Sequence, residues 1–326
     1  MDPRPFLRGV AFPGTAAVPY PRAKPDDAIR LPADTWAAAR IPVGVRLELG
    51  GEAEAVRIGY RTATDELGYR GDGAGRTFAL WRDGRCVDQA AALLGEGSAV
   101  LALGSGSGEA VVYLPEGMRP EILDVEPVGG WIEPAPPKPR WLCYGDSVAE
   151  GWIASGPAFA WPAIAARDQR LDVVNLGYAG AARGEIVSAE NVAELPADVI
   201  SITHGTNCWT RVPHSVGMFR EGLTAFLDVV RQGHPGTPIV VASPVVRPDA
   251  ENQPNRLGAT LSDLRRIMAE VVHDRIEGGD SRMMLVGGFD LLRPEHLGDG
   301  IHPNDAGHAI LAHVLGSAVR TALDTL

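Results

Sequence analysis

Residues Trp141–Ser147 read WLCYGDS and are the most informative short segment of the chain. A short apolar run ends in Gly145-Asp146-Ser147, which is typical of a buried strand that stops at a sharp turn. A serine at such a strand end lies on an exposed loop, with its hydroxyl pointing outward. The hydroxyl is a poor nucleophile until a nearby base takes its proton. An ordinary turn with Ser147 as a helix N-cap would look the same, so other residues must supply the base and the oxyanion donors.

Downstream of this stretch, apolar segments alternate with amphipathic ones. Strands are predicted at 141–144, 172–176, 199–203, 238–242 and 283–286, and helices at 161–167, 216–231, 257–276 and 305–322. This alternation predicts an α/β domain over residues 140–326, built on a parallel sheet with helices on both faces. Sites in such sheets lie at the carboxyl ends of the strands, where Ser147, Gly177 and Asn207 all fall.

Upstream, the pattern changes to short segments in which apolar and polar residues alternate. Such segments lie at 43–49, 55–60, 77–81, 99–103 and 110–114. Together with Gly- and Asp-rich turns, they predict an all-β, jelly-roll-like sandwich over residues 1–130. Residues 131–139 hold four prolines and are predicted to be a semi-rigid linker between the two domains.

The glycine-rich stretch 104–108 (GSGSG) resembles a nucleotide-binding loop only superficially. It lacks the G-x-G-x-x-G spacing, and a strand pattern at 111–114 follows it where a helix would be needed. We therefore expect a hairpin here. A nucleotide-dependent enzyme stays as a distant alternative.

A candidate base lies in the segment Asp299–Pro303 (DGIHP), ahead of the last predicted helix. A carboxylate three residues before a histidine can accept from one ring nitrogen. This contact would leave the other nitrogen of His302 free to take the Ser147 proton. The alternative is that Asp299 and His302 only begin the helix, where acidic residues are favoured.

Candidate oxyanion donors follow the next two predicted strands. Gly177 offers a backbone N–H that no side chain obstructs, and Asn207 offers a side-chain amide. With the N–H of Ser147 they would make three donors around one developing negative charge. Taken singly, Gly177 and Asn207 are also ordinary turn residues.

Gly-Asp-Ser, a glycine, G-x-N and D-x-x-H occur in this order, each after a strand, and this arrangement resembles the SGNH (GDSL) hydrolase family. Ser147, Gly177, Asn207 and His302 match its four namesake positions, and Asp299 matches its usual triad acid. The resemblance covers residues 140–322. It implies a flavodoxin-like sheet and acyl transfer through a serine ester, without metal or organic cofactor. A preceding β-sandwich is similar to two-domain bacterial members, which include carbohydrate esterases and an acyltransferase of polyketide tailoring.

The chain departs from this pattern at Cys208, which stands where the family commonly has an aspartate after the asparagine. The departure leaves the substrate subgroup open. We expect Cys208 to be a buried structural thiol, since no acid–base system is predicted for it. Trp152 and Trp209 directly follow catalytic blocks and either wall the pocket or pack in the ordinary way. His204 is a further candidate for the pocket lining.

Composition excludes several classes of function. A net charge of −11 without a run of Lys or Arg argues against nucleic-acid binding. Three cysteines indicate neither a disulfide framework nor a zinc site. No signal peptide is visible and no apolar run reaches the ~20 residues that a membrane span needs, so a soluble cytoplasmic protein is the expectation. The oligomeric state is left open.

The sequence therefore predicts a serine esterase or acylhydrolase that acts on a small ester, with a short-chain acyl group, an acetylated sugar or a natural product as candidate substrates. Ser147, His302 and Asp299 would form the triad. An acyltransferase that uses the same residues to acylate a hydroxyl acceptor is the main alternative, because hydrolysis and transfer share every catalytic group. A catalytically silent carbohydrate-binding protein is a third.

Overall fold

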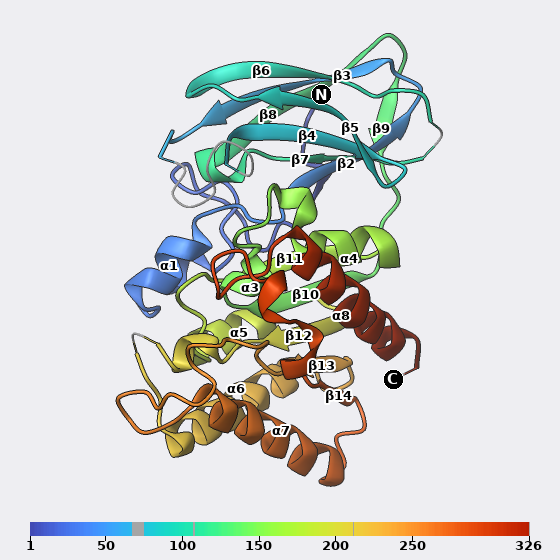
Figure 1. Ribbon diagram of the computed structural model, residues 1–326. Coiled ribbons are helices and arrows are strands. Elements are labelled where there is room, and N and C mark those ends of the chain that lie inside the picture. Colours follow the sequence, from blue (N-terminus) through green and yellow to red (C-terminus); the bar gives the residue numbers. More distant parts are fainter. Residues whose placement is uncertain (67–74, 107, 211, 326) are drawn as a thin grey trace.

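The computed structural model describes residues 1–66, 75–106, 108–210 and 212–325. Its second half is built on a five-stranded parallel sheet with the order β11-β10-β12-β13-β14 (Figure 1). The strands are β10 (Arg140–Gly145), β11 (Asp172–Gly177), β12 (Val199–Thr203), β13 (Ile239–Ala242) and β14 (Met283–Val286). All five were predicted to within two residues. The order is that of a flavodoxin-like fold, as expected.

Both faces of this sheet are buried, and its strands are mostly apolar on both faces, with Asp172, Asn175 and Ser201 as buried polar exceptions. On β10, Leu142 and Tyr144 point into one hydrophobic core, which α5, α6 and α7 cover, while Trp141 and Cys143 point into the opposite core, which α4 and α8 cover. The alternation of side chains along a strand distributes the four residues in this way. The sheet is therefore a rigid central layer that fixes the positions of its strand ends.

Four of the described helices follow the predicted segments, and three are additions. They are α1 (Ala33–Ala39), α3 (Ser147–Glu150), α4 (Trp161–Gln169), α5 (Ile186–Glu194), α6 (Val216–Gly233), α7 (Leu261–Glu277) and α8 (Asp305–Thr325). α1, α3 and α5 were not predicted. α7 begins at Leu261, four residues later than expected, because Thr260 and Asp263 form a capping box there.

The first half holds two antiparallel sheets whose facing side chains share one core, so the predicted sandwich is confirmed (Figure 1, top). One sheet has the order β1-β2-β7-β4-β5, with β9 also on β2; the other has the order β6-β3-β8. The strands are β1 (Leu7–Arg8), β2 (Arg46–Gly51), β3 (Ala55–Thr62), β4 (Thr77–Arg82), β5 (Arg85–Ala91), β6 (Gly95–Ala102), β7 (Ala110–Tyr113), β8 (Pro120–Val128) and β9 (Ile132–Pro134). β8 carries two prolines and lies at a sheet edge, where a missing N–H is tolerated.

The prediction of a hairpin at residues 104–108 is wrong. β6 pairs with β3, whereas β7 pairs with β2 and β4, so the glycine-rich loop crosses from one sheet to the other. Ser107 itself lies outside the described residues. The sequence pattern marks two strands and a turn, but it does not reveal which sheet each strand joins.

Within residues 12–39 the chain contacts both halves: Tyr20 lies in the core of the sandwich, whereas other side chains pack against the α/β sheet. Phe12, Leu31 and Ala39 lie in the same hydrophobic core as Leu142 and Tyr144. Within residues 131–139, β9 pairs with β2, and Lys138 forms ion pairs with Glu48 and Glu109. The division into domains at 1–130, 131–139 and 140–326 stays a prediction, and these contacts tie its parts together. No helix in the described part of the chain is long and apolar enough to cross a membrane.

Candidate active site

Ser147 stands at the junction between β10 and α3. β10 ends at Gly145, where a Cβ would clash with Thr203 Oγ1 and Ala149 Cβ, so the close approach of α3 to β12 requires glycine. Asp146 then caps α3 by accepting the N–H of Val148 at 3.0 Å. Ser147 is therefore the first residue of a short helix at a strand end. The strand end was predicted, but Ser147 is buried at 8% exposure, and Asp146 is the N-cap.

The Asp146 carboxyl is fully buried beneath this turn. Burial raises its pKa to about 6, although the N–H of Val148 and the charge of His302 oppose the shift. A carboxyl so placed fixes the turn through its hydrogen bonds. It makes no hydrogen bond with the Ser147 hydroxyl, so we assign it to structure.

His302 lies beside Ser147, and Asp299 lies behind His302. The distance from His302 Nε2 to Ser147 Oγ is 2.9 Å, and that from His302 Nδ1 to Asp299 Oδ2 is 2.7 Å. Although partial burial opposes the change, hydrogen bonds from the ring and backbone of His302 lower the pKa of Asp299, which is thus an anion that accepts the Nδ1–H. This contact leaves the Nε2 lone pair facing the serine hydroxyl. The structure therefore brings these three predicted residues together.

His302 lies in a loop whose two ends are hydrogen-bonded to each other. An antiparallel bridge joins Leu297 to Pro303, and the N–H of Gly298 donates to the carbonyl of His302 at 2.8 Å. The indole ring of Trp152 packs on the imidazole of His302, with 5.1 Å between ring centres. Trp152 thus packs against the candidate base, and whether it also walls the substrate pocket stays a prediction.

The buried side chain of His308 holds Trp152 in place, a role that the sequence did not reveal. Its Nε2–H donates to the carbonyl of Trp152 at 3.1 Å, and its Nδ1 accepts the N–H of Trp161 at 3.3 Å. Burial lowers the pKa of His308 to about 4, so the ring is neutral near pH 7 and can play both parts. His308 is therefore a structural histidine beneath the site.

The N–H of Gly177 is not available to an incoming oxyanion, which corrects the sequence-based assignment. It donates to Asn175 Oδ1 at 2.8 Å within the buried end of β11. The free donor of this loop lies three residues on. The N–H of Gly180 has no acceptor among the described residues, its φ is +70°, and a Cβ there would meet nothing within 4 Å. The sequence offered one sign of this, because a second glycine, Gly180, follows Gly177 in the same loop.

Asn207 lies at the corresponding end of β12, in a short 3-10 turn. One hydrogen of its side-chain amide donates to the carbonyl of Ala181, which orients the amide toward the loop that contains Gly180. An amide NH₂ has two hydrogens, so one donor remains for a ligand. The N–H groups of Ser147 and Gly180 and the Asn207 amide are thus the three donors at these strand ends.

Of the remaining candidates, Cys208 and His204 are buried and Trp209 is half-buried. Burial raises the pKa of the Cys208 thiol well above its usual value, and its Sγ lies 3.7 Å from the carbonyl of Arg183, so the thiol is structural, as expected. His204 is enclosed by Tyr144, Phe219 and Phe226 and does not line an open pocket. The indole of Trp209 donates to the carbonyl of Gln253 and lies under Arg247. Within the described ranges, no group of three or more His, Cys, Asp or Glu is placed to hold a metal ion.

A five-stranded flavodoxin-like sheet with serine, asparagine and histidine at its strand ends defines the SGNH class of ester-acting enzymes. The chain belongs to the GDSL-like lipase/acylhydrolase family, whose model matches residues 143–310. It is thus an esterase or an acyltransferase of that family. Comparison with curated proteins gave no match.

Solved structures similar to this chain share both of its halves. The salicylyl-acyltransferase SsfX3 from a tetracycline biosynthetic pathway has a TM-score of 0.83 and 25% identity, over 98% of this chain and 95% of that chain. A protein of Bacteroides ovatus described as a GDSL-like lipase has a TM-score of 0.78 and 22% identity over the same shares. A family two carbohydrate esterase from Clostridium thermocellum, in complex with cellohexaose, has a TM-score of 0.65 and 17% identity, over 86% and 93%. The last two likenesses concern the fold alone.

Proposed function

We propose that this enzyme cleaves a small ester through a covalent acyl-enzyme on Ser147, with His302 as general base and Asp299 as the acid that orients it. The continuous chain of two hydrogen bonds, 2.9 Å from Ser147 Oγ to His302 Nε2 and 2.7 Å from His302 Nδ1 to Asp299 Oδ2, is the observation that carries the proposal. A base within hydrogen-bond reach of a hydroxyl and itself oriented by a carboxylate is the arrangement that activates serine.

In the first half of the reaction, His302 Nε2 takes the proton of Ser147 while Oγ attacks the ester carbonyl carbon. The negative charge that develops on the carbonyl oxygen is held by the N–H groups of Ser147 and Gly180 and by the Asn207 amide. The tetrahedral intermediate then expels the alcohol, which takes its proton from the imidazolium. Asp299 stabilises that imidazolium throughout.

In the second half, His302 removes a proton from water, and the resulting oxygen nucleophile attacks the acyl-enzyme. Collapse of this second intermediate releases the acid and returns the proton to Ser147. These two steps need no group beyond the residues already named. They explain why a single serine suffices for the whole cycle.

The direct test replaces Ser147 by alanine and measures turnover of p-nitrophenyl acetate. We expect a loss of at least ~10³-fold in kcat with an unchanged melting temperature, because the hydroxyl makes no structural contact besides that with His302. Thr210→Val, which removes a hydroxyl that donates to a carbonyl of the neighbouring Asn207 turn, is the matched control. An alanine variant as active as the wild type would overturn the assignment.

Acyl transfer to a hydroxyl acceptor is the second candidate function. It is favoured by the likeness to the salicylyl-acyltransferase SsfX3, which extends over both halves of the chain. A panel of esters with varied acyl length, assayed with and without sugar or alcohol acceptors, separates the two functions. New ester product that rises with acceptor concentration at constant total turnover supports transfer, and free acid alone supports hydrolysis. A catalytically silent binding protein would leave Ser147 unlabelled by a fluorophosphonate.

A further inference from the structure

Arg22, contributed by the N-terminal segment, is buried directly behind the candidate active site. Its side chain is 1% exposed, and all five of its N–H donors have acceptors. Nε donates to the carbonyl of Ile41 at 2.6 Å, and one terminal nitrogen donates to Ala38 O at 2.6 Å and to Glu150 Oε2 at 3.3 Å. The other terminal nitrogen donates to the carbonyls of Gly177 and Asn175, the latter at 3.4 Å.

These contacts reach the loop that follows β11 from two sides. The carbonyl of Gly177 accepts from Arg22 directly, while Glu150 Oε2 accepts the N–H of Ala179 at 2.8 Å. Between them, the hydroxyl of Tyr178 donates to the carbonyl of Arg22 at 2.7 Å, and its ring lies 5.3 Å from the guanidinium carbon. Three successive residues before Gly180 are thus tied to the Arg22–Glu150 ion pair.

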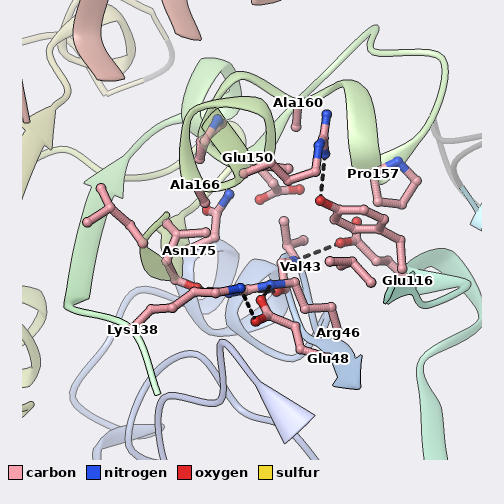
Figure 2. A pocket seen from close by; sticks show the side chains of 18 residues that line it. Val43, Arg46, Glu48, Glu116, Lys138, Glu150, Pro157, Ala160, Ala166 and Asn175 are labelled. Carbon is pink, nitrogen blue, oxygen red and sulfur yellow. Dashed lines mark hydrogen bonds and ion pairs between the residues drawn. The ribbon is translucent and has the colours of Figure 1, made fainter. Parts of the chain in front are cut away.

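Apolar packing alone does not fill the region behind this loop. Glu150 and Asn175 line a small cavity of about 30 Å³ between the sandwich and the α/β sheet, which Figure 2 shows together with Arg46 and Glu48. A space of this size holds about one water molecule. The polar contacts of Arg22 and Glu150 therefore add to the burial of Tyr178 and Ala181 in the hydrophobic core in holding the loop.

We propose that Arg22 is a positioning residue that, through Glu150 and the carbonyl of Gly177, aims the N–H of Gly180 at the developing oxyanion. This inference rests on the proposed function, and it links the N-terminal segment to the chemistry at Ser147. Removing one oxyanion donor costs ~10²–10³ in turnover, and a small misplacement of catalytic groups costs up to ~10². A loosened Gly180 should therefore lower kcat by about 10–100-fold and leave KM nearly unchanged.

Arg46, which lies on β2, offers a matched control because its contacts reach the opposite end of β11. It is 4% exposed, pairs with Glu48 at 2.7 Å and Asp172 at 2.9 Å, and donates to the carbonyl of Val173 at 3.0 Å. Arg22 and Arg46 are thus both buried, both paired and both bonded to β11. Only Arg22 is bonded to the end that leads to Gly180.

The experiment compares Arg22→Met with Arg46→Met in the full chain, measuring kcat, KM and melting temperature with p-nitrophenyl acetate. We expect both variants to lose thermal stability, kcat to fall 10–100-fold only in Arg22→Met, and KM to stay within about threefold in both. A kcat for folded Arg22→Met within threefold of wild type, or an equal loss in Arg46→Met, overturns the proposal.

Arg22→Lys keeps the test decisive if Arg22→Met does not fold. Lysine retains a charge beside Glu150, but its three donors on one nitrogen cannot reach the separate carbonyls of Ile41, Ala38 and Gly177. We expect kcat to fall about tenfold, and wild-type kcat in this variant refutes the inference. Ser147→Ala separates a failure of the proposed function from a failure of the role of Arg22. If turnover depends on Ser147 and not on Arg22, only the role of Arg22 is wrong.

Discussion

Replacing Asp299 by asparagine should impair catalysis because the two carboxylate oxygens have different partners. Oδ2 accepts the Nδ1–H of His302 at 2.7 Å. Oδ1 accepts the backbone N–H groups of His302 at 2.7 Å and Ile301 at 3.0 Å. Asparagine keeps one oxygen and replaces the other by an NH₂ donor, so it can satisfy only one of these two sets of donors.

The loss in rate can be worked out from these contacts. If the amide oxygen stays with the backbone, its NH₂ faces His302 Nδ1 and forces the hydrogen onto Nε2, where the ring cannot act as a base. Turning the amide restores the base but gives up two backbone hydrogen bonds, which costs about 2 kcal/mol. Loss of the charge-assisted bond to the imidazolium adds about 1–1.5 kcal/mol. A total of about 3–3.5 kcal/mol corresponds to a loss of about 150–400-fold in kcat.

The assay is steady-state hydrolysis of p-nitrophenyl acetate by Asp299→Asn, with Asp305→Asn as the control. Asp305 accepts from the N–H and the hydroxyl of Ser155 at 2.9 and 2.7 Å and has no hydrogen bond with His302. Its variant should keep kcat within about threefold. A wild-type rate in Asp299→Asn, or an equal loss in both variants, would refute the reasoning about the tautomer of His302.

Two further predictions concern buried groups. Burial lowers the pKa of His308 to about 4 from 6.5, so between these pH values the unfolded chain binds a proton that the folded chain does not. The free energy of unfolding should therefore fall by about 3 kcal/mol as the pH falls from 6.5 to 4. Urea titrations at the two pH values should show that His308→Gln lacks this part of the loss. Equal pH dependence of stability in both proteins would contradict the prediction. The buried Cys208 thiol should be dispensable, so that Cys208→Ala keeps kcat within threefold and loses about 1–2 kcal/mol of stability. In the native protein, Ellman's reagent should titrate the exposed Cys86 and neither of the buried thiols. If Cys208→Ala lost as much activity as Ser147→Ala, the Cys208 thiol would have a chemical role.

The α/β half was predictable because its signals are local. Each strand of the parallel sheet is a short apolar run, and the groups that follow the strands must meet at one edge of the sheet. Asp299 and His302 are three residues apart, so their contact depends on a single loop. The approach of His302 to Ser147 joins residues 155 positions apart, and it was anticipated from the D-x-x-H spacing and the resemblance to the SGNH family.

Contacts between distant segments were not predictable in the same way. The strands on either side of residues 104–108 join different sheets because pairing depends on partners that the local pattern does not specify. The same holds for Gly177, which precedes the more accessible Gly180 by three residues. Only the hydrogen bond from its N–H to Asn175 showed that the first glycine is occupied.

Periodicity in the sequence was enough to predict the class of the fold, while the candidate nucleophile and its partners were predicted from short-range spacing together with the resemblance to the SGNH family. Tertiary structure alone decided which donors are free to hold an oxyanion and which residues stand behind them. Arg22 lies 128 positions before Glu150, and nothing in its neighbourhood along the chain marks it. Its importance arises from burial, because a guanidinium removed from water must find all its acceptors within the protein, and here those acceptors include the loop of the active site.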